Sequence, residues 1–110
     1  MTGGRKFIIE PQSPYYLHPS EGPAVAITSV VFNEKNYDLW RKAVRIALKS
    51  KNKLGFIDGT LSRPESKTEE GRGELEAWEM VNSMICSWII NVIDPKLHTS
   101  VTYAETARVM

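Results

Sequence analysis

The sequence predicts a mainly α protein: a small helical bundle of two main helices plus short C-terminal helices, with an extended proline-rich N-terminal arm and one short strand. Two long segments place apolar residues at helical spacing, and these give the main helices. Four of the six prolines lie in residues 1–24, which excludes a regular helix there. We therefore expect an extended arm over residues 1–24 and one helical domain over residues 25–110.

Large apolar groups interrupt the arm at Tyr15, Tyr16 and Leu17, and we expect them to pin the arm to the core. Residues 25–32 follow with the sequence VAITSVVF, which is apolar and rich in β-branched side chains. Such a run favours an extended backbone. It either forms the one short strand or lies along the helices, because the sequence offers it no obvious strand partner.

An asparagine begins the first predicted helix, since the short side chain of Asn33 or Asn36 can bind a free amide at a helix start. The helix runs to about Lys51. Steps of 100° per residue gather large apolar groups on one face. The members of this face are Tyr37, Trp40, Val44, Ala47 and Leu48.

The other sides of this helix are basic and apolar. Leu39, Ala43 and Ile46 widen the apolar arc beyond the ~100° stripe of a simple surface helix. We therefore expect the helix to be covered on two sides, by its own domain or by a partner. The basic residues opposite the inner face are Arg41, Lys42, Arg45 and Lys49.

A turn and a loop are predicted after the first helix. Gly55 can take the left-handed conformation that closes a helix, and Asp58-Gly59 is a turn signal. Residues 62–73 are polar and predict a solvated loop. The apolar residues of the turn are expected to fold back onto the core: Leu54, Phe56 and Ile57.

The second main helix covers about residues 74–93 and ends at Asp94-Pro95, because the residue before proline avoids the helical region. Its glutamates lie in the first turns, near the positive end of the helix dipole. Its C-terminal half is apolar nearly all round, with Cys86 and Ile90 on the far side, which predicts burial on several sides. The main apolar face consists of Trp78, Val81, Ile85, Trp88, Ile89 and Val92.

The C-terminal residues predict two short helices. Pro95–Tyr103 can form one, with Leu97 and Val101 inward, and Thr106 can cap another. That last helix has only begun at Met110, so we expect the helical domain to be truncated at its C-terminus.

Ten residues from these faces form the predicted structural core: Tyr37, Trp40, Val44, Leu48, Phe56, Ile57, Trp78, Ile85, Trp88 and Ile89. Three apolar residues lie off the inner faces and form a predicted assembly surface: Leu39, Ile46 and Ile90. The three tryptophans could stack on nucleobases, but their positions on apolar helical faces favour core packing.

The composition predicts a globular protein of a reducing compartment. Hydrophobic residues make up 42% and charged residues 25%, which argues against global disorder. The single cysteine, Cys86, excludes an internal disulfide. The apolar stretch at residues 7–9 is far too short for a signal peptide, and no run approaches the ~20 apolar residues of a membrane span. We expect a cytoplasmic or nuclear protein without a membrane partner.

No group of residues predicts catalysis. His18 and His98 stand alone in the sequence, and Cys86 has no local cation to lower its pKa. Glu69-Glu70 lie in the polar loop, where burial cannot tune their pKa values. We expect no enzyme, no cofactor, no metal site and no small-molecule substrate.

Charge is divided along the chain, although the net charge is only +1. Residues 35–53 contain seven cations and one acid, whereas residues 65–79 are mainly acidic. The basic side of the first helix has three possible roles. It can be a solvated face, it can bind RNA phosphates without reading sequence, or it can pair with the acidic start of the second helix on a neighbouring copy.

Several strings resemble the Copia-like N-terminal domain of plant retrotransposons, found at the start of Gag or Gag-Pol polyproteins. Residues 13–20 read SPYYLHPS, residues 36–40 read NYDLW, and residues 51–59 read KNKLGFIDG. The motif SWIIN over residues 87–91 and YAETA over residues 103–107 extend the likeness. Order and spacing resemble the family over about residues 13–110.

The resemblance implies the N-terminal portion of a capsid-like Gag region. Such Gag proteins assemble into virus-like particles that enclose the RNA of a transposable element. It therefore implies a non-catalytic structural module, a polyprotein fragment whose partners are other copies or the remaining Gag segments. Non-specific RNA binding through the basic helix side is the alternative function. In this family the matched aromatic residues are expected to determine the fold.

Overall fold

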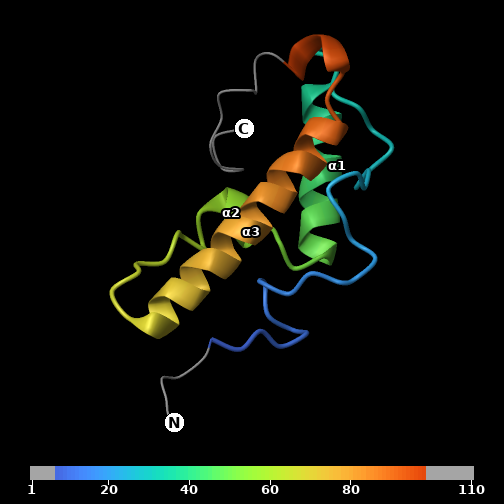
Figure 1. Ribbon diagram of the computed structural model, residues 1–110. Helices are drawn as coiled ribbons and strands as arrows, with labels where there is room; N and C mark the ends of the chain where they lie inside the picture. Colours follow the sequence, from blue (N-terminus) through green and yellow to red (C-terminus); the bar gives the residue numbers. More distant parts are fainter. Residues whose placement is uncertain (1–6, 99–110) are drawn as a thin grey trace.

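The computed structural model of the protein describes residues 7–98 and is built from helices (Figure 1). In chain order these are α1 (Tyr37–Ser50), α2 (Gly55–Asp58), α3 (Glu69–Asn91) and the 3-10 helix η1 (Pro95–Leu97). α1 and α3 are long, and the described residues contain almost no strand, so the predicted mainly α class is confirmed. The predictions for Val101 and for a helix from Thr106 lie outside the described residues.

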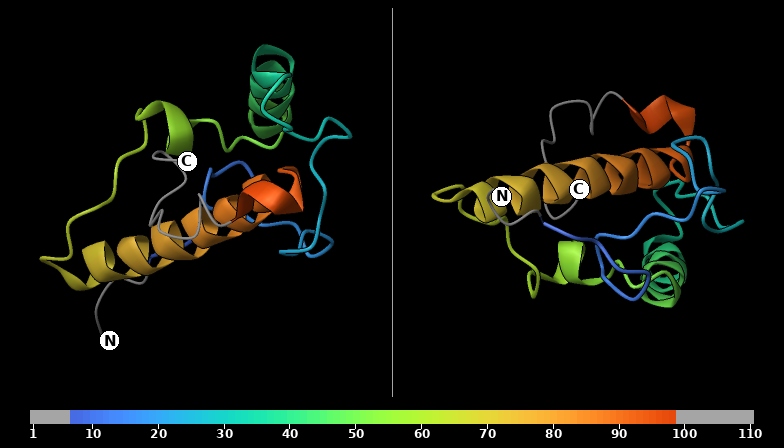
Figure 2. Two further views of the ribbon diagram at one scale, coloured as in Figure 1. Left: turned by 90° about the horizontal axis from the view of Figure 1, so that it is seen from above. Right: turned by 60° about the horizontal axis from the view of Figure 1, so that its bottom comes forward.

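α1 and α2 lie on the same side of α3, as both views of Figure 2 show. α1 packs beside the C-terminal half of α3, and α2 lies near its middle (Figure 1). The N-terminal half of α3 extends beyond α1. This arrangement leaves one side of α1 and the first turns of α3 as separate surfaces.

The core lies where α3 meets α1, α2 and the arm. Trp88, Leu48 and Ile85 are fully buried at its centre, and Phe56 of α2 is almost fully buried. Burial of each such side chain contributes about 1.5–3 kcal/mol. Eight of the ten predicted core residues are buried: Trp40, Val44, Leu48, Phe56, Trp78, Ile85, Trp88 and Ile89.

The core prediction is wrong for Tyr37, whose side chain is 52% exposed at the first residue of α1. Among the described aromatic residues, its ring meets only Phe32 and Trp40, with centroid distances of 6.1 and 6.3 Å. Helical spacing gives the direction of a side chain but not whether another element covers it. Ile57, also predicted as core, is half-buried and packs against the edge of the core.

Asn52 closes the end of α1, and the prediction that Gly55 does so is wrong. Asn52 has a left-handed backbone (φ 60°), which asparagine tolerates better than most residues. Its N–H donates to the carbonyl of Lys49 (3.0 Å), and the N–H of Lys53 donates to that of Leu48 (2.7 Å). These two bonds form a Schellman motif. Gly55 begins α2 instead.

α3 begins five residues earlier than the predicted start at residue 74. Thr68 has an extended backbone, and its Oγ1 accepts a hydrogen bond from the N–H of Gly71 (2.9 Å). Glu69 and Glu70 then lie in the first turn, where the helix dipole favours acids. The two glycines in residues 69–73 predict a loop, but the Thr68 cap overcomes their low helix propensity.

Residues 25–32 form no named strand and lie along the helices, the second of the two predicted outcomes. The contact nearest to a strand pair is a single parallel bridge between Phe32 and Ile93. There the N–H of Phe32 donates to Val92 O (2.8 Å), and the N–H of Asp94 donates to Phe32 O (2.9 Å). The bridge ties the segment before α1 to the end of α3.

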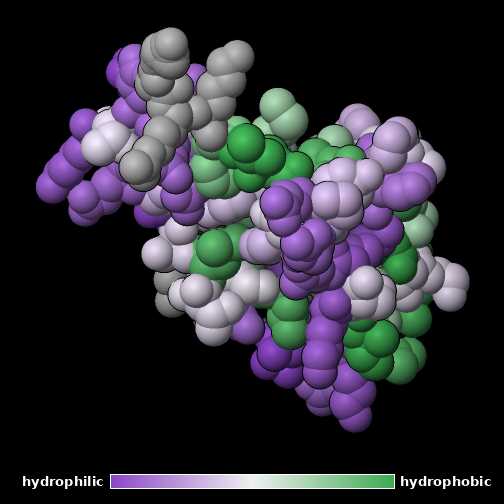
Figure 3. All heavy atoms as spheres, turned by 90° about the horizontal axis from the view of Figure 1, so that it is seen from below, coloured by the Kyte–Doolittle hydropathy of each residue, from purple (hydrophilic) through white to green (hydrophobic). Residues whose placement is uncertain are grey.

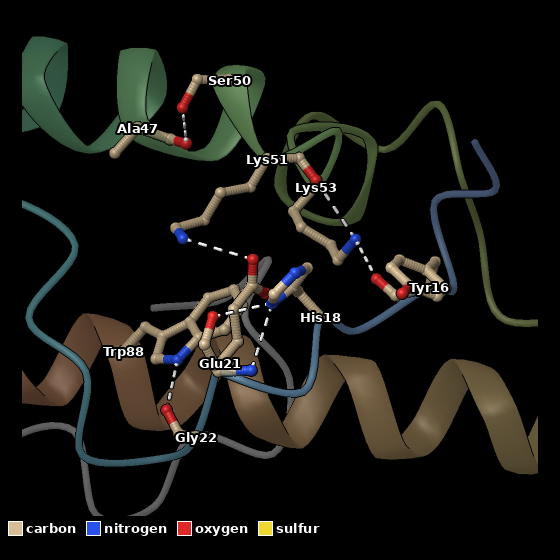
Figure 4. A network of polar contacts seen from close by, with 10 residues as sticks. Tyr16, His18, Glu21, Gly22, Ala47, Ser50, Lys51, Lys53 and Trp88 are labelled. Carbon is tan, nitrogen blue, oxygen red and sulfur yellow. Dashed lines mark hydrogen bonds and ion pairs between the residues drawn. The ribbon is translucent and has the colours of Figure 1, made fainter. Parts of the chain in front are cut away.

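The arm is fastened between α1 and α3, as Figure 4 shows. The indole N–H of Trp88 donates to Gly22 O (2.8 Å), and the amide of Asn91 donates to Pro23 O (2.6 Å). From the other side, Lys51 Nζ lies 3.5 Å from a carboxylate oxygen of Glu21 and 5.3 Å from the centroid of the Trp88 ring. The arm is therefore part of the packed structure.

Tyr15 pins the arm, as its apolar ring predicts. The ring is buried and lies edge-on to Phe7 and Phe56, with centroid distances of 5.5 and 6.1 Å. Its hydroxyl donates to Glu74 Oε2 (2.9 Å). Burial, and then the neighbouring Glu74 carboxylate, raises the pKa of this phenol well above its ordinary value. Tyr15 thus joins the arm to the first half of α3.

Lys53 belongs to the basic segment of the sequence, but its side chain is buried. It is only 2% exposed, and its Nζ donates to the carbonyl oxygens of Tyr16 (2.7 Å) and Lys51 (3.2 Å). Burial lowers the pKa of its ammonium group, and the nearby Glu21 carboxylate partly opposes this. Lys53 therefore holds the arm and contributes nothing to a basic surface.

Candidate functional site on the outer side of α1

The side of α1 turned away from the core presents apolar and basic groups together. Leu39 and Ile46 are 61% and 66% exposed and stand seven residues apart, so they point in nearly the same direction. About 10 Å of helix separates them. We call the exposed residues here the α1 face; they are Asp38, Leu39, Lys42, Ile46 and Lys49.

The four predicted RNA-binding cations lie on consecutive turns of α1. Arg41, Lys42 and Lys49 are exposed, and Arg45 is half-buried. None of the four forms an ion pair with any residue between 7 and 98. Their charges are therefore not neutralised within the described part of the molecule.

Arg45 differs from the other three cations because it borders a hollow of about 240 Å³. Trp40 forms part of the wall, and its indole N–H is buried without a hydrogen-bond partner among the described residues. An unpaired buried donor is uncommon in folded proteins. The remaining lining residues come from α1, α2 and α3: Tyr37, Arg41, Val44, Ile57 and Ile89.

The third residue of the predicted assembly surface, Ile90, is not as open as Leu39 and Ile46. It lies on α3 and is half-buried, whereas the other two stand on α1 and are mostly exposed. The structure therefore brings Leu39 and Ile46 together on one helix face and leaves Ile90 on another element.

A second surface, which the sequence does not predict, lies between the arm and the N-terminal half of α3. It is a hollow of about 640 Å³, and we call it the acidic hollow. Met80 is 65% exposed at its edge. The lining residues are Phe7, Ile9, Tyr15, Glu69, Arg72, Gly73, Glu76, Ala77, Met80 and Val81. The one sequence signal for it was the run of glutamates in residues 69–79.

Gly73 lets the arm cross α3 closely at the acidic hollow. A Cβ atom at this position would lie 2.9 Å from the Cβ of Phe7, closer than side chains normally approach. The glycine that seemed to belong to a loop is thus a crossing point between the arm and the helix.

Apolar groups reach the surface elsewhere too. On the face shown in Figure 3, hydrophobic residues are visible in several separate patches, each bordered by hydrophilic residues. Scattered apolar residues are ordinary on protein surfaces. The α1 face and the acidic hollow each combine apolar groups with charged residues on one helix.

The titratable residues considered in the sequence lie apart. His18 shares a hydrogen bond with the Ser20 hydroxyl (2.7 Å), and His98 Nε2 lies 2.8 Å from the carbonyl oxygen of Ile93. Burial raises the pKa of the half-buried Cys86 thiol. Within residues 7–98, no group of three or more histidine, cysteine or acidic side chains is positioned to hold a metal ion.

No helix in the described part of the chain combines the length and the apolar character needed to cross a bilayer.

Comparison with known proteins gave one family match. The model of the Gag polypeptide of LTR copia-type elements matches residues 18–65, which contain the second part of the arm, α1 and α2. Comparison with curated proteins found no match, and neither did comparison with solved structures. The match confirms the resemblance seen in the sequence: over residues 18–65 this chain is similar to the Gag polypeptide of LTR copia-type elements.

Proposed function

We propose that the chain is a structural module of a copia-type Gag protein that associates with further copies of itself and catalyses no reaction. The observation that carries the proposal is the exposure of Leu39 and Ile46 on one side of α1. Two large aliphatic side chains on one helix stripe form a seam that a partner can cover. The family match supports a Gag-like structural role.

The proposal predicts that association depends on the apolar part of the α1 face. The purified chain, freed of nucleic acid, should show a weight-average mass that rises reversibly with concentration in sedimentation experiments. The double variant Leu39→Lys, Ile46→Lys should remain a monomer, because two ammonium groups cannot be buried in the contact without a large desolvation cost.

A matched control adds the same two charges elsewhere. Ser62→Lys with Ser66→Lys lies in the exposed loop before α3, and we expect it to associate like the wild type. A wild-type chain that stays monomeric at every concentration would contradict the proposal. If the α1 variant and the wild type associate equally, Leu39 and Ile46 do not contribute to the contact between copies.

RNA binding is the second candidate function, and one observation favours it. Arg41, Lys42, Arg45 and Lys49 have no ion-pair partner among the described residues. If all four contact phosphates of a single strand, the slope of log K against log salt should be about −3. The variant Arg45→Glu, Lys49→Glu should lose most of this affinity and about half of the slope, as measured by fluorescence anisotropy with a labelled oligonucleotide.

The variant Leu39→Lys, Ile46→Lys distinguishes the two functions. It adds positive charge to the α1 face, so RNA binding should become tighter while self-association is lost. Retention of RNA by the Arg45→Glu, Lys49→Glu variant at wild-type strength would exclude the basic side of α1 as an RNA site.

A further inference from the structure

We propose that the α1 face of one copy docks into the acidic hollow of the next copy, so that the contact is head-to-tail. The inference rests on the proposed self-association and names the mating surface. It follows from charge, from the lengths of the two faces, and from their separate places on the molecule.

The two surfaces carry opposite charge. Residues 69–79 contain five glutamates and one arginine, of which Glu69, Arg72 and Glu76 line the acidic hollow. Glu79 pairs with Arg63 (2.6 Å) and Glu74 accepts from Tyr15, but Glu69, Glu70 and Glu76 form no ion pair with any described residue. Residues 37–50 offer four cations against one acid. Opposite charge guides docking and disfavours contacts between two like surfaces.

Both surfaces also have apolar centres. On the hollow side, Phe7, Ile9 and Met80 line the depression, and Met80 is 65% exposed. On the α1 face, the side chains of Leu39 and Ile46 are exposed to a similar fraction. Apolar groups surrounded by charges are typical of a protein interface with a polar rim.

The lengths of the two faces match. The hollow follows one stripe of α3 with the helical spacing Glu69, Arg72, Glu76 and Met80, which spans about 16 Å at 1.5 Å per residue. The α1 face runs from Leu39 to Lys49, about 15 Å. Each stripe recurs every three or four residues, the pattern that allows two helices to pack along their length.

The two surfaces of one chain cannot meet. Trp40, Val44 and Leu48 turn the inner side of α1 toward α3, so the α1 face points away from it. The hollow lies on the N-terminal half of α3, beyond the part that α1 covers (Figures 1 and 2). Docking must therefore join different molecules. Because each copy keeps one free surface of each kind, growth continues into a ring or a filament instead of stopping at a two-fold dimer.

Two variants that each lose one surface test the pairing. Leu39→Lys with Ile46→Lys removes the α1 face, and Glu76→Lys with Met80→Lys removes the hollow. Both pairs replace exposed side chains, so far-UV circular dichroism and the urea midpoint should match the wild type. Each variant alone should associate about tenfold or more weakly than the wild type, since both surfaces are needed.

Mixing the two variants gives the decisive result. Each contributes the surface that the other lacks, so we expect a one-to-one complex with the mass of two chains that does not grow with concentration. The wild type under the same conditions grows further. Glu65→Lys, which lies outside the hollow, serves as a charge control and should behave like the wild type.

Other outcomes overturn the inference in distinguishable ways. If the hollow variant associates like the wild type while the α1 variant does not, the α1 face pairs with another surface; the proposed function then stands and the head-to-tail pairing falls. If the two variants fail to complement each other, the pairing also falls. A wild type that gains mass only when RNA is added overturns both the proposed function and the pairing.

Discussion

Replacement of Trp88 by alanine is expected to lower the free energy of unfolding by about 4–6 kcal/mol. The ring is fully buried at the centre of the core, and truncating a buried tryptophan costs about 3–5 kcal/mol. The change also leaves Gly22 O without its hydrogen bond, which adds about 1 kcal/mol. Domains of this size are stable by about 5–15 kcal/mol, so the variant should be largely unfolded or close to it.

Urea titration followed by far-UV circular dichroism measures the effect. Trp88→Phe is the matched control, because it keeps an aromatic ring but cannot donate to Gly22 O. It should fall between the wild type and the alanine variant. A loss below about 1 kcal/mol for the alanine variant would mean that Trp88 does not join α3 to the arm as described.

Replacement of Trp40 by alanine should lower the free energy of unfolding by about 3–5 kcal/mol, through the loss of packing. The ring is buried on the inner face of α1, with its centroid 5.1 Å from that of Phe32. Its indole N–H has no hydrogen-bond partner within residues 7–98, so the variant loses packing and no hydrogen bond that the structure describes. The measurement is again the urea midpoint, with an unchanged dependence on urea concentration as the sign of two-state unfolding.

The phenylalanine variants separate the two tryptophans. Trp40→Phe removes an unsatisfied buried donor, whereas Trp88→Phe removes a hydrogen bond 2.8 Å long. Trp40→Phe should therefore be the less destabilising of the two. A larger loss at position 40 than at position 88 would indicate that the Trp40 N–H has a partner in solution.

Helical spacing was the most reliable information in the sequence. It placed Trp40, Val44 and Leu48 on the inner side of α1, and Trp78, Ile85 and Trp88 on that of α3, where all six are buried. These residues are large and recur every three or four positions, so one helix face must be covered. The same spacing failed for Tyr37, because coverage at a helix end depends on what the fold places there.

Local signals at glycines were the least reliable. Gly55 was expected to close α1, but the left-handed position falls at Asn52. Gly71 and Gly73 predict a loop, but both lie within α3. A glycine permits several conformations, and the neighbouring contacts select one of them. At Gly73 the contact is with Phe7, far away in the sequence.

The candidate surfaces were predictable in unequal measure. The α1 face follows from the sequence of a single helix, because helical spacing alone places Leu39 and Ile46 away from the inner side. The acidic hollow combines residues of the arm with residues of α3, so no local sequence pattern predicts it. Lys53 shows the same limit: its position in a basic run suggested a surface charge, whereas the fold buries it.

The attachment of the arm to the end of α3 has a consequence for the order in which the chain folds. The bonds from Trp88 to Gly22 and from Asn91 to Pro23 join residues 66 and 68 positions apart. During synthesis from the N-terminus, these anchors do not exist until nearly all of α3 has been made. α1 can form early from local contacts, but the arm is fixed only after a long loop closes. We therefore expect the arm to be among the last parts of the protein to become resistant to proteolysis as the chain folds.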